Sequence, residues 1–184
     1  MMKKIPETID TLISARWIIP IRPTGITLEN HSIAIHDGRI VDILPRSEAT
    51  RRYDATYGID LPQHVLTPGL INAHGHTAMS LFRGMADDYP LQTWLEDYIW
   101  PAEEQWVSEE FVYDGSQIAI AEMLRSGTTT FSDMYFFPNA VAKAASEAGI
   151  RAQIAFPVFD IPTAWGQDPD DYIRKGLNVR DDFK

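Results

Sequence analysis

The stretch TPGLINAHGHTAMSLFRG, residues 67–84, decides how the rest of the sequence is interpreted. Its two histidines, His74 and His76, flank Gly75 and follow a Pro-Gly pair and a short apolar run. Residues i and i+2 of a β-strand point to the same face, so an extended backbone here would direct both imidazoles to one point. Neutral imidazoles are good ligands for Zn²⁺ and other divalent metals. The alternative is a pair of surface histidines that only form hydrogen bonds, because zinc needs three or four protein ligands.

Downstream of this stretch, the apolar pattern alternates between strands and helices. Strands are predicted over residues 64–76, with a turn inside this segment, and over residues 128–136 and 150–159, and helices over residues 109–126 and 139–148. Ser108 is suited to cap the first of these helices, and Gly127 to end it. Leu91, Trp94 and Leu95 begin the apolar face of a further short helix, which Pro101 is predicted to stop. The order strand, helix, strand, helix, strand is typical of parallel βα units, and hence of an α/β fold.

The residues before this region predict a small antiparallel sheet. Ile33 and Ile35 alternate with small or polar residues, and Asp37-Gly38 is a two-residue turn that tolerates positive φ. The apolar residues from Ile40 onward form the return strand, which Pro45 ends. These residues therefore predict a β-hairpin.

Composition narrows the function further. The chain has 184 residues with 16 basic and 26 acidic side chains, a net charge of −10, which argues against binding a nucleic-acid backbone. It contains no cysteine, so any metal must be held by His, Asp or Glu. No apolar run approaches the ~20 residues that span a bilayer, and the first residues do not form a signal peptide. We therefore expect a cytoplasmic protein without membrane or nucleic-acid partners.

The sequence also resembles a known family. TPGLINAHGH is similar to the metal-binding first barrel strand of the amidohydrolase superfamily, whose signature is Pro-Gly, apolar residues and His-x-His. Residues 77–104 and 122–136 are similar to its methylthioadenosine / S-adenosylhomocysteine deaminase branch, which includes adenosine-deaminating relatives. The similarity is continuous from about Leu66 to Ala148.

The resemblance implies a fold. It implies that residues 66–184 are the N-terminal portion of a (β/α)8 TIM-like barrel, its first three or so βα units. It also implies that residues 1–65 are part of a small β-sandwich domain built from both chain ends. Since a complete barrel needs about 250 residues, we expect a C-terminal part of the same protein to be missing. We expect the present residues alone to be poorly stable and inactive.

The resemblance also implies a site with one divalent metal, usually zinc. His74 and His76 would hold it together with a later His and Asp, and no histidine follows His76. The remaining ligands and the general acid/base are therefore expected beyond Lys184, and no catalytic residue is assigned here. Glu103, two residues after a proline, would contact the ribose hydroxyls, and Trp94 would cover the site. Without the resemblance, Glu103 would be a solvated helix-cap carboxylate and Trp94 a core residue.

Asp133 lies near the carboxyl end of a predicted strand, where it would orient a ligand histidine or cap the next loop.

The function that follows is metal-dependent hydrolytic deamination of an adenine nucleoside to its inosine analogue and ammonia. Methylthioadenosine, adenosine and S-adenosylhomocysteine are the substrates implied, and a homo-oligomer is expected. Phe156 and Pro157 stand where some members of the branch carry a substrate-binding arginine, which argues against the carboxylate-bearing homocysteine substrate. Two alternatives stay open: a deaminase or chlorohydrolase of another heteroaromatic ring, such as guanine or a triazine, and an inactive metal-binding fragment.

Overall fold

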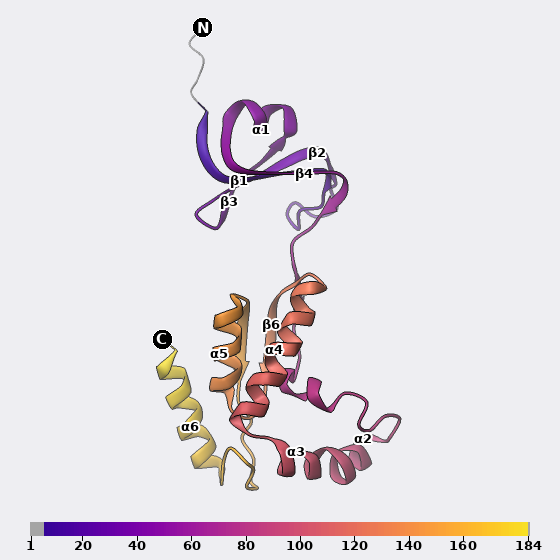
Figure 1. Ribbon diagram of the computed structural model, residues 1–184, viewed down its shortest axis with the longest axis vertical. Coiled ribbons are helices and arrows are strands. Elements are labelled where there is room, and N and C mark those ends of the chain that lie inside the picture. The colour runs from indigo at the N-terminus through magenta and orange to yellow at the C-terminus, as the bar shows by residue number, and fades with distance from the viewer. Residues whose placement is uncertain (1–5, 184) are drawn as a thin grey trace. The chain divides into compact units, whose positions relative to one another are not determined.

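The computed structural model describes residues 6–183, which form two compact units that meet in sequence between Pro68 and Gly69 (Figure 1). Each unit has its own sheet and its own buried core. Within residues 6–183, no helix combines the length and the hydrophobicity needed to cross a bilayer.

The first unit is a four-stranded sheet with one short helix. Its elements are β1 (Glu7–Ile18), β2 (Leu28–His36), β3 (Arg39–Pro45), α1 (Arg46–Arg52) and β4 (Tyr53–Leu66). The strand order is β3-β2-β1-β4, in which β1 runs antiparallel to β2 and parallel to β4. The predicted hairpin is confirmed as β2 and β3, which pair antiparallel with Ile33 opposite Ile43.

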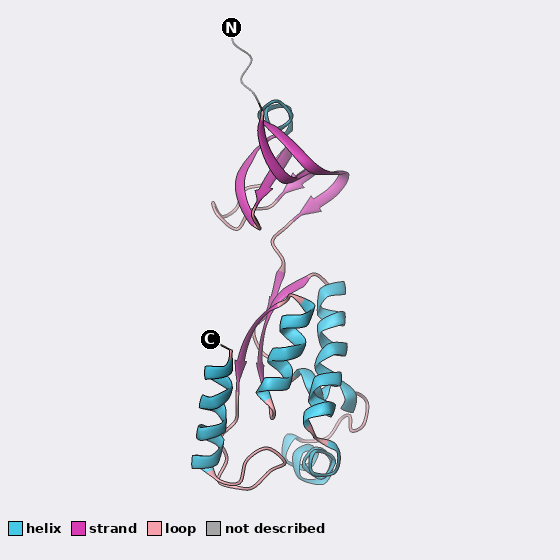
Figure 2. Ribbon diagram, turned by 60° about the vertical axis from the view of Figure 1, so that its left-hand side comes forward, coloured by secondary structure: helices cyan, strands magenta, loops and turns pink. Residues whose placement is uncertain are grey.

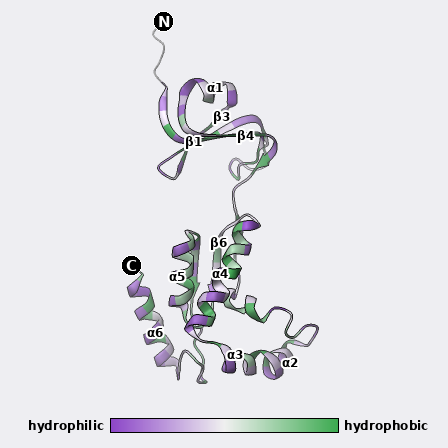
Figure 3. Cartoon of the chain, viewed as in Figure 1, coloured by the Kyte–Doolittle hydropathy of each residue, from purple (hydrophilic) through white to green (hydrophobic). Residues whose placement is uncertain are grey.

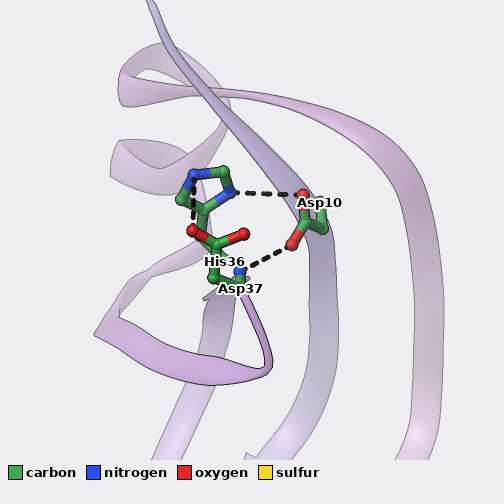
Figure 4. A group of neighbouring side chains, drawn as sticks. All are labelled: Asp10, His36 and Asp37. Atoms are coloured by element: carbon green, nitrogen blue, oxygen red, sulfur yellow. Dashed lines mark hydrogen bonds and ion pairs between the residues drawn. The ribbon is translucent and has the colours of Figure 1, made fainter.

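The hairpin turn is held by an aspartate from β1. Asp37 and Gly38 both have positive φ, at 49° and 68°, as the two-residue turn requires. Asp10 accepts a hydrogen bond from the Asp37 backbone N–H at 2.7 Å, and its other carboxylate oxygen lies 3.2 Å from His36 Nδ1 (Figure 4). Both oxygens of Asp10 thus serve the turn, which stabilises the hairpin against β1.

The second unit contains a three-stranded parallel sheet and its connecting helices (Figure 2). Its strands are β5 (Leu70–Asn72), β6 (Thr128–Met134) and β7 (Arg151–Ala155), in the order β5-β6-β7. Its α-helices are α2 (Leu91–Thr93), α3 (Trp100–Trp106), α4 (Glu109–Arg125), α5 (Pro138–Ala148) and α6 (Pro169–Asp182). A 3₁₀ helix, η1 (Thr77–Phe82), and a π-helical segment, η2 (Trp94–Ile99), complete it. The α/β class is therefore confirmed.

Local signals set the helix boundaries. Ser108 Oγ accepts a hydrogen bond from the Phe111 backbone N–H at 3.1 Å at the start of α4. Gly127 and Gly149 follow α4 and α5 with φ of 87° and 69°, a conformation that favours glycine. The helix α6 is mostly hydrophilic along its length (Figure 3), and the side chain of its N-cap, Asp168, accepts a hydrogen bond from the Asp171 backbone N–H at 2.8 Å. The predicted ends of α4 and α5 are confirmed.

Two local predictions are wrong. The helix that starts at Leu91 does not stop at Pro101. The π-helical segment ends at Ile99, and the chain continues as the α-helix α3 from Trp100. Pro101 thereby falls in the first turn of α3, where a missing N–H breaks no α-helical hydrogen bond. The predicted strands also extend too far: β5 ends at Asn72, before His74 and His76, and β7 ends at Ala155 and not at residue 159.

The core of the second unit holds the segment after the histidines against α4. Thr77 and Ser116 are buried, and their hydroxyl oxygens are 3.0 Å apart. Gly115 lies so close to Ala78 that an added Cβ would be 2.5 Å from the Ala78 carbonyl oxygen and 2.9 Å from its Cα. Only glycine permits this backbone approach, which places η1 directly on α4.

This contact predicts the effect of Gly115→Ala. Alanine favours a helix over glycine by up to about 1 kcal/mol, but here its methyl group would overlap backbone atoms. We expect the free energy of unfolding of the full-length protein, measured by urea denaturation, to fall by about 1–3 kcal/mol, which is the usual effect of overpacking. Asp114→Ala, at an exposed position of the same helix, is the control. A Gly115→Ala variant as stable as this control would contradict the packing argument.

Candidate metal and substrate site

His74 and His76 lie in the turn between the carboxyl end of β5 and η1. Their ring centroids are 5.1 Å apart and the ring planes meet at 83°. His74 is exposed and His76 half-buried. The structure thus brings the two predicted ligands together, although a turn and not a strand does so. The carboxyl ends of parallel strands are where α/β folds place their active sites.

The end of β6 orients His76. His76 Nδ1 lies 2.7 Å from the Met134 carbonyl oxygen, which can only accept, so Nδ1 carries a proton and, in the neutral imidazole, Nε2 keeps its lone pair. The Met134 backbone N–H donates to the Gly75 carbonyl oxygen at 3.2 Å. The His74 backbone N–H donates to Asn72 Oδ1 at 3.3 Å. These bonds prepare His76 to ligate a metal through Nε2.

Asp133 is buried under the same turn, with 1% of its surface exposed. Its Oδ1 accepts a hydrogen bond from the Thr77 backbone N–H at 2.6 Å, whereas its Oδ2 is buried without a hydrogen-bond partner. Burial raises the pKa of Asp133, and the hydrogen bonds from Thr77 and the charge of His76 oppose this rise. The aspartate therefore supports the turn that follows His76, and its unpartnered oxygen favours positive charge nearby.

A cavity of about 870 Å³ opens beside His76. Trp94 and Glu103 line it, as do apolar side chains that come mainly from four segments. The apolar lining residues are Met79, Leu95, Ile99, Trp100, Met134, Phe136, Pro157, Phe159, Ile161, Pro162 and Ala164. Apolar walls with a few polar groups are typical of small-molecule sites. Three of the four predicted site residues thus share one cavity, while His74 lies outside its lining.

Glu103 projects from α3 and is partly buried. The Tyr135 hydroxyl donates to Glu103 Oε1 at 2.7 Å. Burial raises the pKa of Glu103, while this hydrogen bond and the charge of His76 act to lower it. Glu103 is therefore a held acceptor at the cavity wall and not a solvated cap, and Trp94 is fastened by its Nε1–H to the Ala86 carbonyl oxygen at 3.0 Å.

The donor set fits a zinc ion in part. Two imidazoles, one of them with its other nitrogen bonded to a carbonyl, are the usual zinc ligands, and the unpartnered Asp133 Oδ2 adds negative charge. Among residues 6–183, the one group of three ligating side chains within 4.8 Å of one another is elsewhere: exposed Asp10, His36 and Asp37. Their mutual hydrogen bonds in the hairpin turn explain that group.

Sequence reasoning missed Tyr135 and the carbonyl of Met134. Both follow Asp133 at the carboxyl end of β6, in the run Asp-Met-Tyr-Phe, so their position beside the His pair could have been inferred from parallel pairing with β5. The contact between Tyr135 and Glu103 joins residues 32 apart in sequence, and no local pattern indicates it.

Comparison with known proteins gives consistent matches. A model described as the amidohydrolase family matches residues 65–183. The chain is 58% identical, over its whole length, to a 5-methylthioadenosine/S-adenosylhomocysteine deaminase of Saccharophagus degradans, and covers 41% of that protein. It is 52% identical, over 96% of its length, to the enzyme of the same name from Teredinibacter turnerae, of which it covers 40%.

A crystal structure is also similar to the chain. An adenosine deaminase from Xanthomonas campestris with bound zinc superposes with a TM-score of 0.95 at 41% identity, over 98% of this chain and 41% of that one. The chain thus spans about two-fifths of the length of the relatives it matches.

The buried carboxyl of Glu103 predicts a pH-dependent effect of Glu103→Gln. Because the pKa is raised on folding, the folded state binds a proton more readily, and this contribution to stability is lost as pH rises through the raised pKa. Glutamine does not titrate and still accepts from Tyr135. The free energies of unfolding of metal-free Glu103→Gln and of the metal-free unmodified protein are compared by urea denaturation at several pH values. From about pH 4 upward, the variant should become progressively more stable relative to the unmodified protein. Glu104→Gln controls for the loss of one charge, and a difference independent of pH would contradict the prediction.

Proposed function

Because the chain belongs to the amidohydrolase family, we propose that it supplies part of the active site of a zinc-dependent deaminase of adenine nucleosides. One observation carries the proposal: a single cavity holds both an imidazole oriented for a metal, His76, and a carboxylate suited to sugar hydroxyls, Glu103. The names of the two deaminase relatives, and the bound zinc of the similar crystal structure, support it.

Each residue contributes one function to the reaction. Zinc bound at this site would lower the pKa of a water molecule and so make a nucleophile for C6 of the purine available at neutral pH. His74 and His76 hold the ion, and the Met134 carbonyl keeps His76 in the tautomer that can bind it. Glu103 accepts hydrogen bonds from the ribose hydroxyls, and Trp94 covers the purine and excludes water. Within residues 6–183 we assign no group to proton transfer.

We further propose that the parallel strands β5, β6 and β7 are the first strands of a barrel and that residues 1–65 belong to a small β-sandwich. In this arrangement the barrel wall places His74, His76 and the end of β6 at one rim. The rim is then completed by ligands from outside residues 6–183, since zinc sites need three or four protein ligands.

The metal assignment predicts the effect of His74→Ala. Removing one of two imidazoles at this turn should reduce the zinc content of the full-length protein to near zero and abolish turnover, because a site with one ligand fewer binds the ion weakly. Zinc is measured by elemental analysis, and deamination by the change in purine absorbance. His64→Ala, an exposed histidine on β4, should leave both unchanged. Full zinc occupancy in His74→Ala would defeat the assignment.

The lining of the cavity predicts which 5′ group is preferred. Among the described lining residues the charged side chains are Glu103 and Glu104, both acidic, and Pro157 rather than Phe156 faces the cavity. The Phe156 ring instead packs close to Gly176 and near Trp165.

A substrate carboxylate has no cationic partner on this wall, so kcat/KM should be at least about tenfold higher for methylthioadenosine than for S-adenosylhomocysteine. Steady-state kinetics with both substrates measure the ratio, and 5′-deoxyadenosine serves as a second uncharged substrate. Equal or faster turnover of S-adenosylhomocysteine would contradict the prediction.

A further inference from the structure

A buried tyrosine hydroxyl joins the two halves of the site. Tyr135 directly follows β6 and is 5% exposed, with its ring 6.3 Å from the His76 ring and 5.1 Å from that of Phe136. Its hydroxyl donates to Glu103 Oε1 at 2.7 Å. Burial and the Glu103 charge raise the pKa of this phenol, so it keeps its proton and stays a donor.

Consecutive residues of one segment hold both predicted functional groups. Asp133 accepts from the Thr77 backbone N–H at 2.6 Å, Met134 accepts from His76 Nδ1 at 2.7 Å, and Tyr135 donates to Glu103. Because these contacts come from neighbouring residues, the end of β6 sets the distance between the histidine turn and the carboxylate on α3. A substrate that spans both must match that distance.

A glutamate carboxylate that recognises a substrate benefits from a hydrogen bond that fixes its orientation. Its terminal torsion is broad and the side chain has several rotamers, which a substrate would have to immobilise on binding. A charge-assisted hydrogen bond to Oε1 holds the group, and the Oε2 atom remains to accept from a ligand. Preorganisation of this kind raises affinity by reducing the entropy lost when the substrate binds.

We propose that Tyr135 is a positioning residue that holds the Glu103 carboxylate for recognition of the substrate's sugar hydroxyls. The inference rests on the proposed function and names what determines its preference for a ribose-bearing substrate. Tyr135 acts through Glu103 and has no role in the chemical step.

The test uses Tyr135→Phe in the full-length, zinc-loaded protein, with adenosine and 2′,3′-dideoxyadenosine as substrates. The variant removes one oxygen atom and keeps the ring. KM for adenosine should rise about tenfold with kcat little changed, because a charge-assisted hydrogen bond is lost from a residue that binds the ground state and the transition state alike. The constants for the dideoxy analogue, which lacks both hydroxyls, should stay the same. The preference for adenosine therefore falls about tenfold.

Tyr113→Phe is the matched control. The Tyr113 hydroxyl also donates to a carboxylate, that of Glu147, but it links α4 to α5 away from the cavity. This control should leave the preference for adenosine unchanged. Zinc content is measured for every variant, and should equal that of the unmodified protein.

Several outcomes would overturn the inference. A purely structural role would reduce activity toward both substrates equally or reduce zinc content, and a dispensable hydroxyl would change neither substrate. If Tyr135→Phe does not fold, Tyr135→Met, which lacks the hydroxyl but fills the space, must show the same selective loss. An unmodified protein that deaminates neither substrate would overturn the proposed function, whereas one that deaminates adenosine while Tyr135→Phe keeps its full preference overturns this inference alone.

Discussion

The hydrogen bond from His76 Nδ1 to the Met134 carbonyl oxygen, 2.7 Å long, is the contact on which the site depends. It requires β6 to lie beside β5 in parallel register, because only then does the end of β6 reach the turn that follows Asn72. That register in turn needs α4 to return the chain from η1 to the start of β6. The close approach of Gly115 to Ala78 makes this return compact. The hydrogen bond to His76 thus depends on packing contacts that begin at α4.

Much of the second unit could be predicted from sequence because its signals are local. Ser108, Gly127 and Gly149 act within one turn of the helix ends they define, and β6 and β7 each begin within two residues of one of these glycines. The hairpin of the first unit was predictable for the same reason, since Asp37-Gly38 specifies the turn by itself. Local patterns predict less well where the backbone departs from ideal α-helical geometry. At Pro101 the predicted helix end is wrong, because a π-helical segment precedes this residue and places it in the first turn of α3.

The sequence predicts part of the site, and the residues that it does not predict escape detection for the same reason. His74, His76 and Glu103 belong to recognisable sequence patterns, and the structure places His76 and Glu103 on one cavity. The partners that orient them, Met134 and Tyr135, contribute a backbone carbonyl and a phenol, groups that any sequence contains in many places. Their significance comes from contacts across 58 and 32 residues of sequence, which depend on strand pairing and helix packing. Sequence patterns show the reactive groups, and tertiary structure is needed to show what holds them.

The electrostatics of the turn explain why these groups belong together. Asp133 and Glu103 are both acids whose pKa burial raises, and Asp133 Oδ2 has no hydrogen-bond partner. Two such carboxylates, Asp133 in β6 and Glu103 on α3 beside Tyr135, are unfavourable in an apolar surrounding unless they are protonated or positive charge offsets them. A protonated His76 would interact favourably with each of them, yet an imidazole that binds a metal is neutral. A cation held by the histidine pair would supply compensating charge, so the buried acids and the two imidazoles are together suited to bind one.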